Sequence, residues 1–332
     1  MKDLGQIGMI GGGSWATAIM KMLTANDGVV NWWVRSQETV DHINEFHHNP
    51  RYITSVEFAP EKISVSNDLL SIIRASDTLI LAVPSAFIKG TLEEVDKKEL
   101  EGKVIFSAIK GIVPETLQII GEFLFEHYDT TKENFGVICG PCHAEEVAME
   151  KLSYLTIACQ DTAKAESMAA TLSTPFIRTS PSDDIYGTEY AAILKNVVAI
   201  ASGICHGLGY GDNFNAVLIS NAIQEIERFA NKVHPIERDI KGSAYLGDLL
   251  VTAYSQHSRN RMFGSMIGKG YSVKAAQMEM NMIAEGYYAT ECVFKINEKA
   301  GVDMPISEAV YKILYAGKRP KKVMKSLSER LA

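Results

Sequence analysis

The chain has 332 residues, more than one ordinary globular core, which predicts two domains. Its net charge of -7 argues against nucleic acid as the main partner, because binding to polyanions depends on lysine and arginine. The N-terminus lacks a signal-peptide pattern, and no apolar run approaches the roughly 20 residues that span a bilayer, so we expect a cytoplasmic protein without membrane insertion.

Short apolar runs alternate with helical patterns in the first half of the chain, which predicts β-α-β units around a parallel sheet. Helical patterns begin near Ser14, Gln37 and Ala144. We therefore expect a doubly wound, Rossmann-like α/β domain over residues 1–185 that binds a dinucleotide. The predicted strands are Gln6–Ile10, Val29–Val34, Thr78–Val83, Val104–Ile109, Phe135–Cys139 and Tyr154–Ala158.

The first predicted strand runs into the glycine-rich stretch IGGGSWATA. Gly11, Gly13 and Ala16 give it the G-x-G-x-x-A form of a dinucleotide fingerprint, placed between a strand and a helix as that fingerprint requires. The first glycine makes the turn and the second lets the pyrophosphate approach, while the helix N-terminus supplies amide donors. The sequence therefore predicts a dinucleotide site here, although such a turn can also be purely structural.

The end of the second predicted strand reads NWWVRSQ. Enzymes specific for NAD usually have an acidic residue there that binds the ribose 2′-hydroxyl, whereas an arginine accommodates a 2′-phosphate. Arg35 follows Val34, and no acidic residue occurs before Glu38. This favours NADP(H), used alone or alongside NAD(H); a solvated surface arginine is the alternative.

The stretch CGPC, from Cys139 to Cys142, lies between a predicted strand and a helix start, which is the context of a thioredoxin-like redox motif. The preceding dinucleotide fold argues against that function, and no second ligand pair is spaced for zinc, so we expect no metal. We interpret CGPC as a turn that borders the nucleotide cleft. The chain's five cysteines are an odd number and fit reduced thiols.

After about Asp184, apolar residues recur at steps of three and four, which predicts an all-helical domain over residues 186–332. Its first helix, GTEYAAILKNVVAIASGI, places Lys195 and Asn196 on an otherwise apolar background. Small neighbours such as Ala191 and Ala199 leave room beside the ammonium group. A partly desolvated lysine can exchange a proton with a substrate oxygen, but a lysine on a helix flank is also common.

Two further stretches favour a site around Lys195. Lys110 follows the predicted strand Val104–Ile109, and ligands bind at the carboxyl ends of strands in open α/β sheets. Asp248 lies on an apolar background and can tune a lysine or cap a helix. The polar cluster Ser258–Arg261 offers the donors of a phosphate site or forms a solvated helix face.

These residues together resemble the bacterial type of NAD(P)-dependent glycerol-3-phosphate dehydrogenase. The matching stretches occur in order over nearly the whole chain, and LKNVVAIASG with SRNR is far more specific than the glycine fingerprint. The resemblance implies reversible hydride transfer between sn-glycerol 3-phosphate and dihydroxyacetone phosphate, in a homodimer that supplies the backbone of phospholipids. The stretches are GGGSWATA, AVPS, IKG, GP, LKNVVAIASGICHGLGYGDN, LGDLLVT, SRNRMFG, AEGYYAT and AGVDMPISEAVYKILY.

The resemblance also implies site residues. Lys195 matches the proton donor and acceptor, with Lys110, Asn196 and Asp248 around the substrate. Further substrate-binding residues are Gly140, Cys142, Ser258, Arg259 and Asn260, the last three at the phosphate end. The implied nucleotide contacts, besides Gly11 and Gly13 of the fingerprint, are Ser14, Trp15, Arg35, Lys110, Ala144, Arg259, Ile283 and Glu285.

The chain departs from the family pattern at few positions. Cys142 stands where the family usually has serine or threonine, which puts its hydrogen bond to the substrate in doubt and suggests sensitivity to alkylation. KGSAYLGD replaces a glycine-rich run before Asp248. Two alternatives share the dinucleotide fingerprint: a 3-hydroxyacid dehydrogenase of similar architecture, whose substrate ends in a carboxylate, and a protein that senses NADPH without turnover.

Overall fold

The computed structural model describes residues 4–26, 28–280, 282 and 284–331. These residues form two compact units. The first comprises the described residues up to Ile109 together with Ile120–Ile185. The second comprises Lys110–Ile119 and the described residues from Tyr186 onward. The expected domains of residues 1–185 and 186–332 differ from these units in one segment, because Lys110–Ile119 packs with the second unit.

The first unit is built on an eight-stranded sheet with the order β10-β9-β8-β5-β4-β1-β2-β3. All neighbours pair in parallel except β8 and β9. Successive strands are added on one side of β1 up to β3 and on its other side from β4 onward. The boundary between β1 and β4 is therefore the switch point of a doubly wound fold. The strands are β1 (Ile7–Ile10), β2 (Val30–Trp33), β3 (Ile63–Ser66), β4 (Thr78–Leu81), β5 (Val104–Ser107), β8 (Phe135–Cys139), β9 (Ser153–Cys159) and β10 (Ile177–Ser182).

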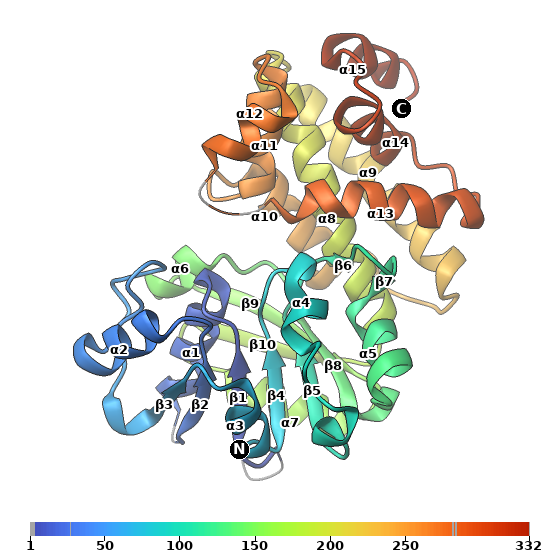
Figure 1. Ribbon diagram of the computed structural model, residues 1–332. Helices are drawn as coiled ribbons and strands as arrows, with labels where there is room; N and C mark the ends of the chain where they lie inside the picture. The colour runs from blue at the N-terminus through green and yellow to red at the C-terminus, as the bar shows by residue number, and fades with distance from the viewer. Residues whose placement is uncertain (1–3, 27, 281, 283, 332) are drawn as a thin grey trace. The chain divides into compact units, whose positions relative to one another are not determined.

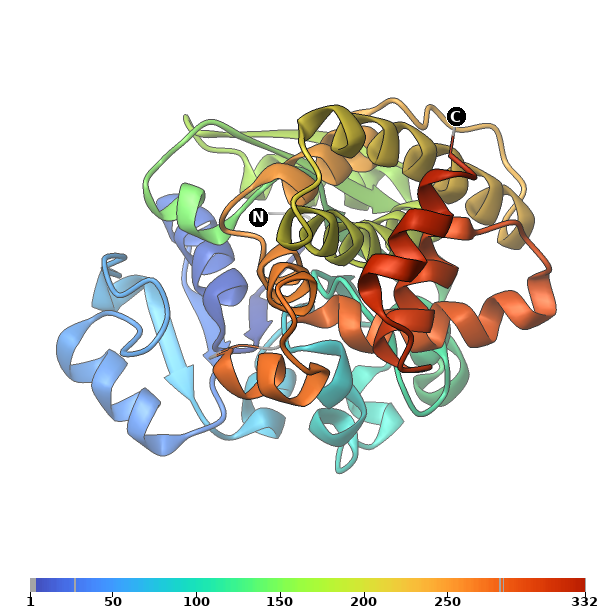
Figure 2. The same ribbon diagram turned by 90° about the horizontal axis from the view of Figure 1, so that it is seen from above.

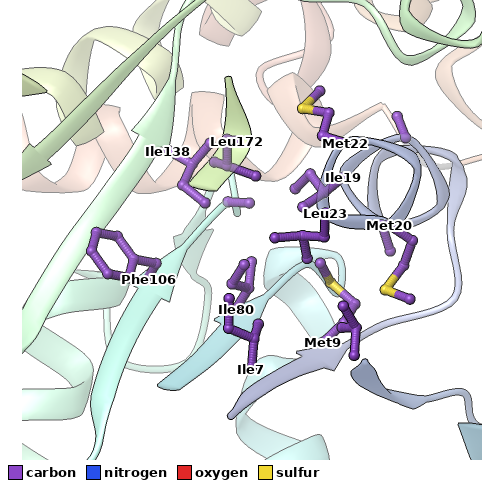
Figure 3. Packing of buried hydrophobic residues seen from close by; sticks show 14 of the residues in the cluster. Ile7, Met9, Ile19, Met20, Met22, Leu23, Ile80, Phe106, Ile138 and Leu172 are labelled. Atoms are coloured by element: carbon purple, nitrogen blue, oxygen red, sulfur yellow. The ribbon is translucent and has the colours of Figure 1, made fainter. Parts of the chain in front are cut away.

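Helices lie on both faces of this sheet, as Figure 1 shows, and α1 contacts both α6 and α7. Figure 3 shows the core between α1 and the sheet, where Ile19 and Leu23 face Ile7, Met9 and Ile80. Burial of these side chains holds the glycine turn between β1 and α1 in place. The helices are α1 (Ser14–Ala25), α2 (Gln37–Phe46), α3 (Leu69–Arg74), α4 (Ser85–Leu92), α5 (Ile120–Tyr128), α6 (Ala144–Ala148) and α7 (Thr162–Leu172).

The described residues of the second unit form helices and a small antiparallel hairpin of β6 (Ile112–Val113) and β7 (Gln118–Ile119). Helices α14 and α15, red in Figure 2, pack against each other. The helices are α8 (Ile185–Gly207), α9 (Asp212–Val233), α10 (Asp248–Tyr254), α11 (Arg259–Gly268), α12 (Val273–Glu279), α13 (Glu285–Ala300), α14 (Pro305–Leu314) and α15 (Pro320–Ser328). A π-helical turn at Ser243–Gly247 precedes α10.

Helix α8 departs from the expectation that no apolar run approaches membrane-spanning length: by length and composition alone it could cross a membrane, but 89% of its apolar window is buried inside the protein. That burial is typical of a core helix in a globular unit. Lys195 and Asn196 therefore lie in one of the least exposed segments of the chain.

Candidate active site

The turn between β1 and α1 has the conformation that its glycines predict. Gly11 adopts a φ of 139°, and a Cβ there would lie 2.5 Å from the carbonyl oxygen of Ala82. Trp32 donates from Nε1 to the Gly11 carbonyl at 2.7 Å. No described side chain caps α1 at Gly13, and, apart from its two chain neighbours, no described residue lies within 4 Å of a Cβ built there. The turn therefore leaves space and helix amides for a pyrophosphate.

The other cofactor residues predicted in the first unit surround this turn or follow neighbouring strands. Ser14 is the buried first residue of α1, and Trp15 packs against the hydrophobic core. Ala144 begins α6, which contacts α1. Arg35 is the second residue after the end of β2 and is exposed, so its guanidinium is accessible to a ligand.

The CGPC stretch forms a tight connection between β8 and α6. Gly140 adopts a φ of 120°, and a Cβ there would lie 2.8 Å from the Tyr154 carbonyl oxygen on β9. Cys139 and Cys142 are both buried and form no disulfide. The glycine is thus explained by close backbone approach, and the two thiols lack the exposure of a redox pair.

Lys195 is buried in the second unit beside two other charged groups. Its side chain is 5% exposed and forms an ion pair with Oδ1 of Asp248, whose side chain is 1% exposed. Lys110 Nζ lies 3.6 Å from the other carboxylate oxygen, Oδ2. Two ammonium groups therefore share one carboxylate, and with all three ionised the cluster carries one net positive charge. Such a cluster suits an anionic substrate.

The pKa of Lys195 reflects this burial. Desolvation and the positive charge of Lys110 lower the pKa, the attraction of Asp248 raises it, and the net effect lowers it to about 7. Desolvation is the largest cause, because an ammonium group loses its hydration inside the protein. Near neutral pH, Lys195 is thus present in both its acidic and basic forms and can give or take a proton.

Asn196 positions the backbone next to this cluster. Its Nδ2 donates to the Lys110 carbonyl at 2.9 Å, so it joins α8 to the segment that carries Lys110. A Cβ on Gly286 would lie 2.6 Å from the Asn196 carbonyl, so α13 also approaches closely here. These contacts make Asn196 a support for the backbone of Lys110.

At the start of α11, the side-chain oxygen atoms of Ser258 and Asn260 each accept a hydrogen bond from a backbone amide. Ser258 caps the helix, its Oγ accepting from the Arg261 amide at 3.3 Å. Asn260 Oδ1 accepts from the Gly286 amide at 2.9 Å. Because both side chains accept structural hydrogen bonds, the hydroxyl hydrogen of Ser258 and the amide hydrogens of Asn260 can serve as donors to an anion. Arg259 Nη1 lies 3.6 Å from Sδ of Met282.

Glycines set the register between α8 and α11. Added Cβ atoms on Gly264 and Gly268 would collide with the carbonyl oxygens of Ile200 and Ile204, four residues apart on α8. The two helices thus run in parallel, and one turn earlier Asn196 is level with Asn260. Gly286 approaches the carbonyl of Asn196 closely and donates its amide hydrogen to the side chain of Asn260. These glycines are not among the predicted site residues, although their i, i+4 spacing in α11 is a usable signal.

The predicted site residues fall into two groups. The second unit brings together Lys110, Lys195, Asn196, Asp248 and the first turns of α11 and α13, including Glu285. Ile283 lies outside the described residues. Across the described part of the chain, no group of three or more His, Cys, Asp or Glu could hold a metal ion. The first unit holds Gly11, Gly13, Ser14, Trp15, Arg35, Gly140, Cys142 and Ala144.

Comparison with known proteins covers nearly the whole chain. Residues 6–165 match the N-terminus, and residues 184–325 the C-terminus, of NAD-dependent glycerol-3-phosphate dehydrogenases. The chain is 38% identical to the glycerol-3-phosphate dehydrogenase (NAD(P)+) of Exiguobacterium sp., over 98% of this chain and 96% of the relative. It is 35% identical to the corresponding enzyme of Macrococcus caseolyticus, over 98% of both chains. The crystal structure of glycerol-3-phosphate dehydrogenase from Coxiella burnetii is similar, with a TM-score of 0.91 and 28% identity over 97% of this chain and 98% of that one.

Proposed function

Because the chain belongs to the NAD(P)-dependent glycerol-3-phosphate dehydrogenase family, we propose that it catalyses reversible hydride transfer between NAD(P)H and dihydroxyacetone phosphate, yielding sn-glycerol 3-phosphate. The observation that carries this proposal is the buried cluster of Lys195, Asp248 and Lys110, level with the donors of α11. The cluster combines a proton donor with positive charge. Reduction of a phosphorylated ketone requires both, because its carbonyl oxygen takes up a proton and its phosphate is an anion.

In the reducing direction, the ammonium group of Lys195 gives a proton to the carbonyl oxygen of the substrate. The nicotinamide, when bound, supplies the hydride that reduces the carbonyl carbon. In the oxidising direction, the neutral amine of Lys195 takes the proton from the substrate hydroxyl. Asp248 orients Lys195 and partly offsets the charge of Lys110, so that Lys195 titrates close to neutral pH.

The phosphate of the substrate is assigned to the first turn of α11. Ser258 and Asn260 donate neutral hydrogen bonds, and Arg259 adds a planar set of charged donors. Lys110 contributes a second positive charge. Gly140 and Cys142 are assigned to the substrate by the family pattern, and the Cys142 thiol is a weaker hydrogen-bonding group than the hydroxyl that is usual there.

The cofactor is assigned to the glycine turn of the first unit. Gly11, Gly13 and the first amides of α1 suit the pyrophosphate, and Arg35 suits the ribose 2′-phosphate of NADPH. Ser14, Trp15 and Ala144 complete the contacts in this unit. The family pattern also assigns Lys110, Arg259 and Glu285 of the second unit to the nucleotide.

At the level of the cell, we assign the chain to the cytoplasm as a homodimer whose product supplies phospholipid synthesis. The net charge of -7 and the absence of a polyanion-binding composition support a small-molecule enzyme without a nucleic-acid partner.

An initial-rate assay tests the activity. We expect dihydroxyacetone phosphate to drive NADPH and NADH oxidation, while simple keto acids do not; efficient turnover of keto acids alone would support a hydroxyacid dehydrogenase instead.

Lys195→Met should lower kcat by about 10²- to 10⁴-fold, the usual contribution of a general acid. NADPH binding, measured by cofactor fluorescence, should survive that change. A wild-type protein that binds NADPH tightly but shows no turnover would indicate a sensor.

A further inference from the structure

Asn49 is a buried polar side chain that links the glycine turn to a second segment of the first unit. It is 1% exposed. Its Nδ2 donates to the Gly12 carbonyl and to Thr17 Oγ1, both at 3.0 Å. Its Oδ1 accepts from the backbone amides of Arg51 at 3.0 Å and Tyr52 at 3.1 Å. All the hydrogen-bonding capacity of the carboxamide is therefore used.

This link fixes the backbone of Arg51 relative to the dinucleotide turn. Thr17 Oγ1, one partner of Asn49, donates in turn to the Gly13 carbonyl at 3.0 Å. The hydrogen bonds of Asn49 that hold the glycine turn therefore also fix the backbone position of Arg51.

The side chain of Arg51 reaches the start of α2. Its Nη2 lies 3.2 Å from Oε2 of Glu38, in the first turn of α2. That helix is capped by Ser36, which directly follows Arg35. Arg51 is therefore held within ion-pair distance of the turn that begins beside Arg35.

The partner of Arg51 is readily exchanged. The side chains of Arg51 and Glu38 are 63% and 81% exposed, and ion pairs at such exposure contribute little to stability. A phosphate carries more charge than a carboxylate and has three acceptor oxygens instead of two. The Glu38 carboxylate thus marks a place where Arg51 can hold an anion, and it also competes with that anion.

We propose that Arg51 is a second specificity-determining residue for the ribose 2′-phosphate of NADPH, acting with Arg35 and opposed by Glu38. The inference rests on the proposed use of NADP(H) and deepens it. NADH lacks the 2′-phosphate, so the contribution of Arg51 is specific to NADPH. Asn49 is the positioning residue that places Arg51 and braces the turn used by both cofactors.

The test compares the dissociation constants and KM values of NADPH and NADH in three variants. Arg51→Ala should weaken NADPH about tenfold, the loss expected for one charge-assisted hydrogen bond, and leave NADH unchanged. Glu38→Gln should tighten NADPH and leave NADH unchanged. Arg74→Ala, which removes another exposed arginine paired with a glutamate in the same unit, serves as the matched control and should change neither cofactor.

Equal effects of Arg51→Ala on both cofactors, or none on either, would overturn the proposal. Direct binding separates it from the proposed function. If the wild-type protein binds both cofactors but does not oxidise them with dihydroxyacetone phosphate, the proposed activity fails, while the ratio of the two dissociation constants still decides the role of Arg51.

Discussion

Burial and two charged neighbours with opposite effects set the pKa of Lys195. Asp248 raises its pKa and Lys110 lowers it, while burial adds the largest lowering effect. Asp248 and Lys110 therefore have separable effects on the pH dependence of the reaction, even though both lie beside the substrate in the proposed mechanism. Simple loss of activity would not distinguish them, but the direction of a pKa shift does.

The pH profile of the reaction should follow Lys195. Reduction needs its protonated form, so kcat/KM for dihydroxyacetone phosphate should fall as pH rises through about 7, and oxidation of glycerol 3-phosphate should show the opposite trend. Asp248→Asn removes the effect that raises the pKa and should move the profile to lower pH. Lys110→Met removes a lowering effect and should move it to higher pH. Profiles that coincide with the wild type in both variants would exclude Lys195 as the titrating group.

At the scale of elements, the contact between α8 and α11 determines whether the proton donor and the phosphate donors are level. Glycines at this contact let the backbones touch, and the register follows from carbonyl groups four residues apart. The same feature makes the contact sensitive to a single methyl group, because backbone atoms cannot move aside as a flexible side chain can.

Gly264→Ala should therefore destabilise the protein by about 1–3 kcal/mol, the usual cost of overpacking, and raise KM for dihydroxyacetone phosphate. Gly90→Ala is the matched control, because this glycine also lies inside a helix, α4, but beyond its chain neighbours and the nearby backbone of that helix no described atom is within 4 Å of its added Cβ. That change should stabilise the protein by about 0.5–1 kcal/mol. Chemical denaturation measures both. Equal effects of the two substitutions would show that α8 and α11 tolerate separation.

The sequence predicts the central elements of the first unit well and its edges poorly. The strands predicted around β1, β2, β4, β5, β8 and β9 are present, because buried parallel strands read as continuous apolar runs. The sequence does not predict β3, because apolar and polar residues alternate in this short edge strand. It does not predict β10 either, because that strand contains Pro181, which is tolerated mainly in edge strands. The antiparallel pairing of β8 with β9 was also unexpected in a sheet predicted to be parallel.

The site shows the same division between local pattern and tertiary contact. Lys195 and Asp248 were predicted because charged residues on apolar helices are conspicuous. Asn49 and Gly286 were missed, since their importance arises only from hydrogen bonds and close approaches to residues far along the chain. The hairpin after Lys110 was assigned to the first domain for the same reason.

At the scale of the whole molecule, the two units divide the proposed work, and hydrogen exchange can test the division. An amide that exchanges only after the ligand has left should slow by the factor 1 + [L]/Kd, about a hundredfold at a ligand concentration of 100 Kd. NADPH should produce this slowing in the first turn of α1 and in the amides of Arg51 and Tyr52, which Asn49 holds to that turn. Glycerol 3-phosphate, added to the complex, should slow the Gly286 amide, whose acceptor is Asn260. Helix α15, which carries none of the candidate residues, should exchange at an unchanged rate, and NADPH protection confined to the second unit would contradict the assignment of the cofactor to the glycine turn.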